Sequence, residues 1–322
     1  MRICVYGCGA IGGLLAARLS LSGAIVSVVA RGKQLQAINE NGLTLINQEG
    51  EESSAFVMAA EDPTDLGPQD VVFLTMKAHQ VPAVAAKISL LLSEDTMVVT
   101  AANGLPWWYF HGISDELGTP ELKTVDPGRR LWSTISPQRA VGCVIYPAAS
   151  VIEPGVIRHL FGDQFALGEP NREASPRLAT VSAMLGEAGF VANVQSDIRA
   201  DIWTKLVANA AFNPVSVITG KTLGSMIKDQ AIYTLLERVM NEVVEVAASL
   251  GIEVVMQPRQ LLEATRQLGD HKTSMLQDFQ VGRPLELEPI VGAVAEVGKL
   301  KGIETPSLNA VSKLVLEKSK QS

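Results

Sequence analysis

The sequence predicts an α/β fold in which a doubly wound parallel sheet is followed by an all-helical C-terminal domain. Three observations lead to this prediction. Short apolar runs alternate with helical patterns up to about residue 195, and a glycine-bearing turn follows the first of these runs. After about residue 195 the sequence shows only helical patterns. We therefore expect a sheet domain over residues 1–195 and a helical domain over residues 196–322.

The first thirty residues hold the turn on which the sheet domain depends. An apolar run at residues 2–6 precedes the turn, a helical pattern follows it, and a second apolar run occupies residues 25–30. This order is strand, G-x-G-x-x-G and helix, in which the glycines allow a tight turn, the approach of a pyrophosphate and close helix packing. We predict a Rossmann-type dinucleotide site formed by Gly7, Cys8, Gly9, Ala10, Ile11 and Gly12.

The residue after the second strand indicates which dinucleotide binds. Sites for NAD carry an acidic residue there, which holds the ribose 2′-hydroxyl. This chain has Arg31 instead, with no acid nearby. Because a guanidinium suits a 2′-phosphate through forked hydrogen bonds, we predict NADP(H) as the cofactor. The alternative is that Arg31 is a solvated residue at the start of a loop.

The alternation of strands and helices continues through the rest of the sheet domain. We expect strands at 43–46, 55–58, 70–76, 97–100, 142–152, 155–160, 164–167 and 191–194, and helices at 33–41, 78–92 and 176–187. Ligands of such sheets lie beyond the carboxyl ends of the strands, where Lys77 and Asn103 fall. Taken alone, they could equally be a solvated lysine and a turn-forming asparagine.

A long excursion from the sheet is expected at about residues 106–139, over the mouth of the sheet. It begins with four consecutive aromatic residues, Trp107 to Phe110. Long ordered loops often cover or form binding sites. The aromatic cluster could anchor the excursion or contact another subunit, and the sequence leaves both readings open.

Helices of the second domain are expected at residues 198–212, 230–250, 258–268, 289–300 and 307–319. Lys205, Asn209 and Asn213 are spaced i, i+4, i+8, which places them on one side of the first, otherwise apolar helix. Buried polar groups need partners, which could be a ligand or a structural polar network. We expect Pro214 to end or kink this helix.

A second polar group follows in the helical domain, at Ser274 to Gln277 and at Glu286. Glu286 is flanked by leucines and precedes an apolar helix. Its carboxylate could favour the start of that helix through the helix dipole. It could also be the counter-ion that a buried Lys205 requires.

Composition excludes several classes of protein. The 322 residues suit two domains, and a net charge of −7 without a basic stripe argues against nucleic-acid binding. The longest uncharged stretches are broken by polar residues and proline, so no membrane span is expected. Three cysteines without CxxC spacing indicate free thiols and a cytoplasmic location, and the four histidines, none at ligand spacing, predict no metal.

At these residues the chain resembles the ketopantoate reductases (2-dehydropantoate 2-reductases). The resemblance rests on six segments, which are Gly7 to Gly12, Met76 to Ala78, Asn103-Gly104, Lys205 to Pro214, Ser274 to Asp278 and Leu285 to Glu288. It implies NADPH-dependent reduction of a 2-keto acid to a 2-hydroxy acid, as in pantoate synthesis for coenzyme A. Alternatives are a related dehydrogenase for another hydroxy or imino acid, or a non-catalytic NADPH sensor. A homodimer is one candidate for the assembly.

The resemblance also implies residue roles. Lys205 matches the catalytic lysine, and Glu286 matches a glutamate near lysine and nicotinamide. The residues that match substrate contacts of the family are Asn209, Asn213, Ser274, Met275, Leu276 and Gln277. Arg31 and Lys77 match the residues that bind the 2′-phosphate of the cofactor. Asn103 matches a contact to cofactor or substrate, and Ala148 loosely matches a cofactor contact. The chain departs from the family pattern in the excursion, at Leu223 and at His271, and these departures concern the identity of the substrate and not the type of reaction.

Overall fold

The structure is a computed structural model that describes residues 1–113 and 117–321. Its described residues form two compact units. The sheet unit comprises Met1–Ala102, Trp107–Ile113 and Gly128–Ile198, and the helical unit comprises Asn103–Pro106, Ser114–Pro127 and Arg199–Ser322 apart from the residues outside the description. Two short pieces of the N-terminal half therefore pack with the C-terminal helices, which the sequence did not indicate.

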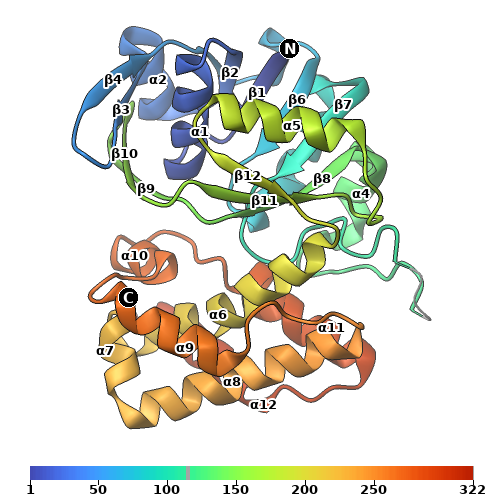
Figure 1. Ribbon diagram of the computed structural model, residues 1–322, viewed down its shortest axis with the longest axis vertical. Helices are drawn as coiled ribbons and strands as arrows, with labels where there is room; N and C mark the ends of the chain where they lie inside the picture. Colours follow the sequence, from blue (N-terminus) through green and yellow to red (C-terminus); the bar gives the residue numbers. More distant parts are fainter. Residues whose placement is uncertain (114–116, 322) are drawn as a thin grey trace. The chain divides into compact units, whose positions relative to one another are not determined.

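An eight-stranded sheet forms the centre of the sheet unit (Figure 1). Its order is β12 (Val191–Val194), β11 (Gln164–Gly168), β8 (Ala140–Ile145), β7 (Leu92–Thr100), β6 (Gln69–Leu74), β1 (Arg2–Tyr6), β2 (Ile25–Val29) and β5 (Met58–Ala60). All neighbours pair in parallel except β8 and β11. Together with the helical second unit, this confirms the predicted fold class.

The register brings the carboxyl ends of the central strands to one edge of the sheet. Tyr6, the last residue of β1, pairs with Val29 of β2 and with Leu74 of β6. Leu74 in turn pairs with Thr100 of β7. The segments that leave these four strands therefore start side by side, as a dinucleotide-binding sheet requires.

A second, four-stranded sheet has the order β4 (Glu52–Ala55), β3 (Leu43–Ile46), β10 (Val156–Phe161) and β9 (Ala148–Glu153). Two predicted strands were wrong because the chain crosses between the sheets within them. The strand expected at 55–58 is the end of β4 and the start of β5, with Phe56 and Val57 between them. The strand expected at 142–152 is likewise β8 and β9, separated at Tyr146 and Pro147.

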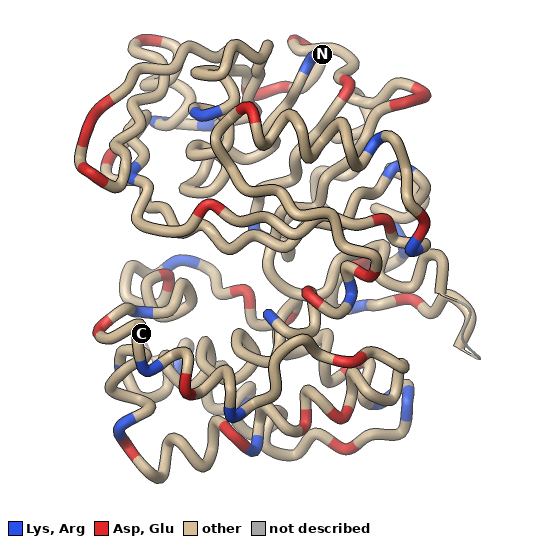
Figure 2. The backbone as a smooth tube through the Cα atoms, in the orientation of Figure 1, with Lys and Arg blue, Asp and Glu red and all other residues tan. Residues whose placement is uncertain are grey.

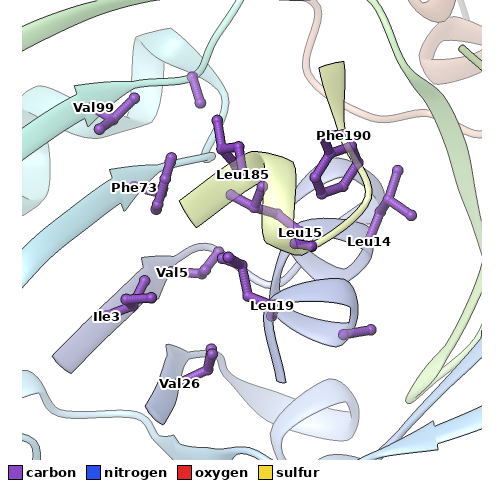
Figure 3. Close-up of a cluster of buried hydrophobic side chains, with 14 of the residues drawn as sticks. Ile3, Val5, Leu14, Leu15, Leu19, Val26, Phe73, Val99, Leu185 and Phe190 are labelled. Carbon is purple, nitrogen blue, oxygen red and sulfur yellow. The ribbon is translucent and has the colours of Figure 1, made fainter. Parts of the chain in front are cut away.

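Helix α1 (Ala10–Leu21) lies between the two sheets and contacts strands of both. It is apolar on nearly all sides, which is typical of a helix that is buried all round. Figure 3 shows Leu14, Leu15 and Leu19 of this helix among side chains of β1 and Phe190. This packing fixes the start of α1 against the end of β1. The other long helices of the unit are α2 (Gly32–Asn41) and α5 (Pro176–Glu187).

The single helix expected at 78–92 was wrong. The structure has a 3₁₀ turn at Ala78–Val84, the short helix α3 (Ala85–Ile88) and a second 3₁₀ turn at Ser89–Leu91. Pro82 lies inside the first turn, and a proline without an N–H cannot continue an α-helical hydrogen-bond ladder. The excursion also contains a short helix that was not expected, α4 (Arg130–Ile135).

The aromatic cluster Trp107 to Phe110 is buried within the sheet unit. Trp108 Nε1 donates to Thr100 Oγ1 at 3.2 Å, and the Tyr109 and Phe110 rings meet edge to face. These contacts favour the anchor reading over the subunit-contact reading.

The helical unit contains seven α-helices among its described residues. They are α6 (Ile198–Thr219), α7 (Leu223–Lys228), α8 (Gln230–Ser249), α9 (Pro258–Thr265), α10 (Ser274–Gln280), α11 (Ala293–Lys301) and α12 (Pro306–Ser319). Pro214 was expected to end or kink α6, and the first of these alternatives is wrong, because the helix continues through it to Thr219. The helix expected at 289–300 begins as a π-helical turn, Glu288–Gly292, before α11.

Acidic and basic residues are interspersed along the backbone of both units, as Figure 2 shows. Glu242 of α8 uses its carboxylate to accept the backbone amides of Ser307 and Leu308 at 2.8 and 2.9 Å, which caps α12. No helix in the described part of the chain is long and apolar enough to cross a membrane.

Candidate functional site

The glycine turn connects β1 to α1 with three glycines that differ in environment. Gly7 has a φ of +105°, and its amide donates to the Val29 carbonyl at 3.1 Å. A side chain at Gly12 would overlap the Gly7 carbonyl oxygen and lie 2.5 Å from Thr75 Oγ1. A side chain at Gly9 would meet no atom within 4 Å. The first glycine thus allows the turn, the third allows close packing, and the second leaves open space.

The start of α1 is suited to an anion. Gly9 is the N-cap and offers no side chain to the first-turn amides, which lack acceptors within the helix. No acidic side chain lies in the first turn. A pyrophosphate placed over Gly9 would meet these amides and the positive end of the helix dipole. The residues present therefore fit a dinucleotide.

Thr75 contacts the backbone of the glycine turn, a role that the sequence analysis did not predict. Its hydroxyl lies 2.7 Å from the Gly7 carbonyl oxygen and 3.1 Å from that of Tyr6. The position directly after β6 is the signal that could have indicated it. Cys8, within the turn, is buried, and burial raises the pKa of its thiol to about 11. This thiol is a packing group in the turn.

Three further residues predicted for cofactor binding lie in the sheet unit. Arg31 follows β2, is exposed, and its guanidinium makes no hydrogen bond or ion pair with the residues that the structure describes. Lys77 follows β6 and is half-buried. The strand register places both at the edge where β1 ends. Ala148 begins β9 in the second sheet, where it pairs with Phe161.

Asn103 belongs to the helical unit although it follows β7 of the sheet. Its side-chain Nδ2 donates to Oε2 of Glu286 at 3.5 Å. Glu286 is buried, and it directly precedes the segment that starts the π-helical turn. The structure thus brings together two predicted site residues that lie far apart in the sequence.

Lys205, Asn209 and Asn213 lie along α6, as their spacing predicted. Lys205 and Asn209 are half-buried, whereas Asn213 is only 4% exposed. The side-chain amides of Asn209 and Asn213 form no hydrogen bond with any described residue. An amide without a protein partner can pair with water or with a ligand. The face that carries these residues is therefore a candidate binding surface.

Helix α10 carries the last four predicted substrate contacts. Ser274 and Gln277 are exposed, while Met275 and Leu276 are buried in the helical unit. Thr273 caps the helix through its hydroxyl, which accepts the Leu276 amide at 3.1 Å. A substrate could reach the exposed pair through side chains. The buried pair can offer only backbone groups unless the helix moves.

Comparison with known proteins identifies the family. The N-terminal model described as ketopantoate reductase PanE/ApbA matches residues 3–172, and the corresponding C-terminal model matches residues 197–319. The chain belongs to the ketopantoate reductase family. As a member, it is a pyridine-nucleotide-dependent oxidoreductase.

Relatives match the chain over nearly its full length. A 2-dehydropantoate 2-reductase of Mesorhizobium japonicum is 45% identical over 316 residues, which cover 98% of this chain and 97% of the relative. The enzyme of the same name from Archaeoglobus fulgidus is 28% identical and covers 94% of this chain and 92% of its own. These matches include both units.

Solved structures agree with this membership. A crystal structure from Ralstonia solanacearum, provisionally described as a ketopantoate reductase, has a TM-score of 0.95 and 39% identity, covering 99% of this chain and 98% of that one. A D-mandelate dehydrogenase with NADH and anilino(oxo)acetate has a TM-score of 0.84 and 22% identity, covering 100% and 99%. The second likeness shows the fold alone.

Proposed function

We propose that this protein uses NADPH to reduce a 2-keto acid to a 2-hydroxy acid, with ketopantoate as the substrate and pantoate as the product. The observation that carries the proposal is the stripe of Lys205, Asn209 and Asn213 on α6. Its two amides have no partner among the described residues, although Asn213 is almost completely buried. A small polar acid would satisfy such groups. The 45% identity to a 2-dehydropantoate 2-reductase supports ketopantoate as that acid.

The chain supplies charge and orientation for this reaction, whereas a nicotinamide bound to the glycine turn supplies the hydride. As the carbonyl carbon is reduced, negative charge develops on its oxygen. We assign the Lys205 ammonium to that oxygen, where it stabilises the transition state and donates the proton. We assign Asn209, Asn213, Ser274 and Gln277 to holding the substrate.

NADP(H) rather than NAD(H) is supported by the end of β2. Arg31 is exposed there, and no hydrogen bond or ion pair with a described residue competes for its guanidinium. Lys77 supplies a second cation at the same edge of the sheet. A 2′-phosphate carries charge that both side chains could meet. The predicted cofactor role of Ala148, the cytoplasmic location and a homodimer stay predictions.

A related dehydrogenase for another 2-keto acid is the second candidate. The two sequence departures that favour it lie together, because the Leu223 amide donates to the His271 carbonyl at 2.9 Å. Leucine in place of a polar side chain would make this part of the helical unit more apolar. A bulkier or more apolar keto acid would suit it.

Oxidation of NADPH by the purified protein tests the proposal. The substrates are ketopantoate, straight-chain 2-keto acids and phenylglyoxylate, and the readout is kcat/KM from absorbance at the nicotinamide band. We expect ketopantoate to have the highest value. A higher value for phenylglyoxylate would favour the second candidate. Binding of NADPH without turnover of any acid would refute the enzyme reading and leave a sensor.

A further inference from the structure

A tight turn at Asn103–Leu105 lies directly on the π-helical turn of the helical unit. The Leu105 amide donates to the Pro289 carbonyl at 3.0 Å. Within the π-helical turn, the Ala293 amide donates to the Glu288 carbonyl, five residues back. π-Helical turns are rare and occur often at functional sites.

Gly104 is the residue that permits this close approach. Its φ is +95°, a conformation that side chains disfavour. A Cβ at this position would overlap the Pro289 carbonyl oxygen and lie 2.7 Å from the Pro289 carbonyl carbon. Both obstacles are backbone atoms, which cannot rotate away as the end of a side chain can. Any side chain at residue 104 must therefore displace the turn.

Displacement of the turn would affect Asn103 first. Its Nδ2 lies 3.5 Å from Glu286 Oε2, at the outer limit of a hydrogen bond. The amide nitrogen is the donor in this contact, so the contact orients the amide with its nitrogen toward Glu286. The other N–H and the oxygen of the Asn103 side-chain amide then point in a fixed direction, where they can bind other partners.

We propose that Gly104 is a positioning residue for the reaction inferred above. By packing against Pro289, it holds the Asn103 amide on Glu286, so that Asn103 acts on the keto acid as part of the helical unit. This inference rests on the proposed function. It concerns the contact of Asn103 with the keto acid.

The test compares Gly104→Ala with Gly220→Ala. Gly220 lies in the same unit, has a φ of +69°, and a Cβ there would meet no atom within 4 Å. The measurements are kcat and KM for ketopantoate, Kd for NADPH and thermal unfolding. We expect Gly104→Ala to raise KM for the keto acid about tenfold or more with NADPH affinity within about twofold, and Gly220→Ala to change neither. The proposal would be overturned if Gly104→Ala left KM for the keto acid unchanged, or if it weakened NADPH binding as much as it raised that KM.

A double variant distinguishes the positioning of Asn103 by Gly104 from a general disturbance of the fold. If Gly104 acts through Asn103, Gly104→Ala causes little further loss in an Asn103→Ala background. Additive losses would overturn the proposal. If Gly104→Ala does not fold, Asn103→Asp provides the test, because it keeps the glycine and places a second carboxylate beside Glu286. An unchanged KM for the keto acid in this variant would overturn the role of Asn103 in substrate binding. An inactive wild-type protein would instead refute the proposed function.

Discussion

The hydroxyl of Ser216 on α6 lies 2.5 Å from the hydroxyl of Thr273, the cap of α10, and both side chains are buried. Ser216 also donates to the Asn213 carbonyl at 2.7 Å, so its single proton is committed there. The Thr273 proton must then go to Ser216, while its oxygen accepts the Leu276 amide. This chain of hydrogen bonds ties the start of α10 to α6 at a predicted substrate residue.

Thr273→Val should reduce the free energy of unfolding by about 1–3 kcal/mol. The variant removes the side-chain cap of α10 and the hydrogen bond that the Ser216 hydroxyl oxygen accepts from Thr273. Thr273→Ser keeps the hydroxyl and should cost less. Urea denaturation of the full chain measures both. A valine variant as stable as the serine variant would show that the hydrogen-bond chain contributes nothing.

Gly9→Ala should weaken cofactor binding without a loss of stability, whereas Gly12→Ala should lower the stability of the protein. The Gly9 site has room for a methyl group in the free protein, so the variant should keep its melting temperature but bind NADPH at least about tenfold more weakly. Gly12→Ala meets backbone and Thr75 atoms, so it should lower stability by about 1–3 kcal/mol. Thermal unfolding and nucleotide titration measure the two effects. Normal NADPH binding by Gly9→Ala would contradict the pyrophosphate assignment.

Lys205→Ala should lower kcat for the keto acid by about 10²-fold or more and leave NADPH affinity nearly unchanged, because the charge acts on the developing oxyanion. Lys221→Ala is the matched control. It removes a partly exposed lysine of the same unit that pairs with Asp229 at 2.7 Å. Steady-state kinetics and nucleotide titration distinguish the variants. Equal kcat values for wild type and Lys205→Ala would remove the catalytic assignment.

Arg31→Asp should shift cofactor preference from NADPH toward NADH, because a carboxylate repels the 2′-phosphate and can accept from a ribose hydroxyl. Arg238→Asp makes the same charge change at an exposed position of α8 and should leave the preference as it is. The ratio of kcat/KM for the two cofactors is the readout. If both variants keep the wild-type ratio, Arg31 is a solvated loop residue.

Alkaline pH should weaken the sheet unit through its buried thiols. Burial raises the pKa of Cys4 from 9.0 to about 12 and that of Cys8 to about 11. Below pH 9 both thiols keep their protons in the folded and in the unfolded state, so the free energy of unfolding does not depend on their ionisation. Above it the unfolded state ionises first, so stability falls by up to about 1.4 kcal/mol per pH unit for each thiol until the folded pKa is reached. Denaturation between pH 8 and 10.5 should give a shallower slope for Cys8→Ala; identical slopes would contradict the burial effect.

The sequence by itself determined the features that depend on local geometry. The spacing of Gly7, Gly9 and Gly12 after a strand decides what each glycine can do, because turn, approach and packing are all set within six residues. The i, i+4, i+8 spacing likewise places Lys205 and Asn213 on one face of a helix, whatever lies around it. Fold class and family followed from such patterns.

Only the tertiary structure decided how distant segments meet. No local pattern pairs Ser216 with Thr273, puts Thr75 beneath the glycine turn, or moves Asn103 from the end of a sheet strand to the helical unit. Pro214 shows the same limit, since packing keeps α6 helical where local preference predicts an end. The physical reason is that burial and hydrogen bonds between remote residues outweigh preferences that act over one helical turn.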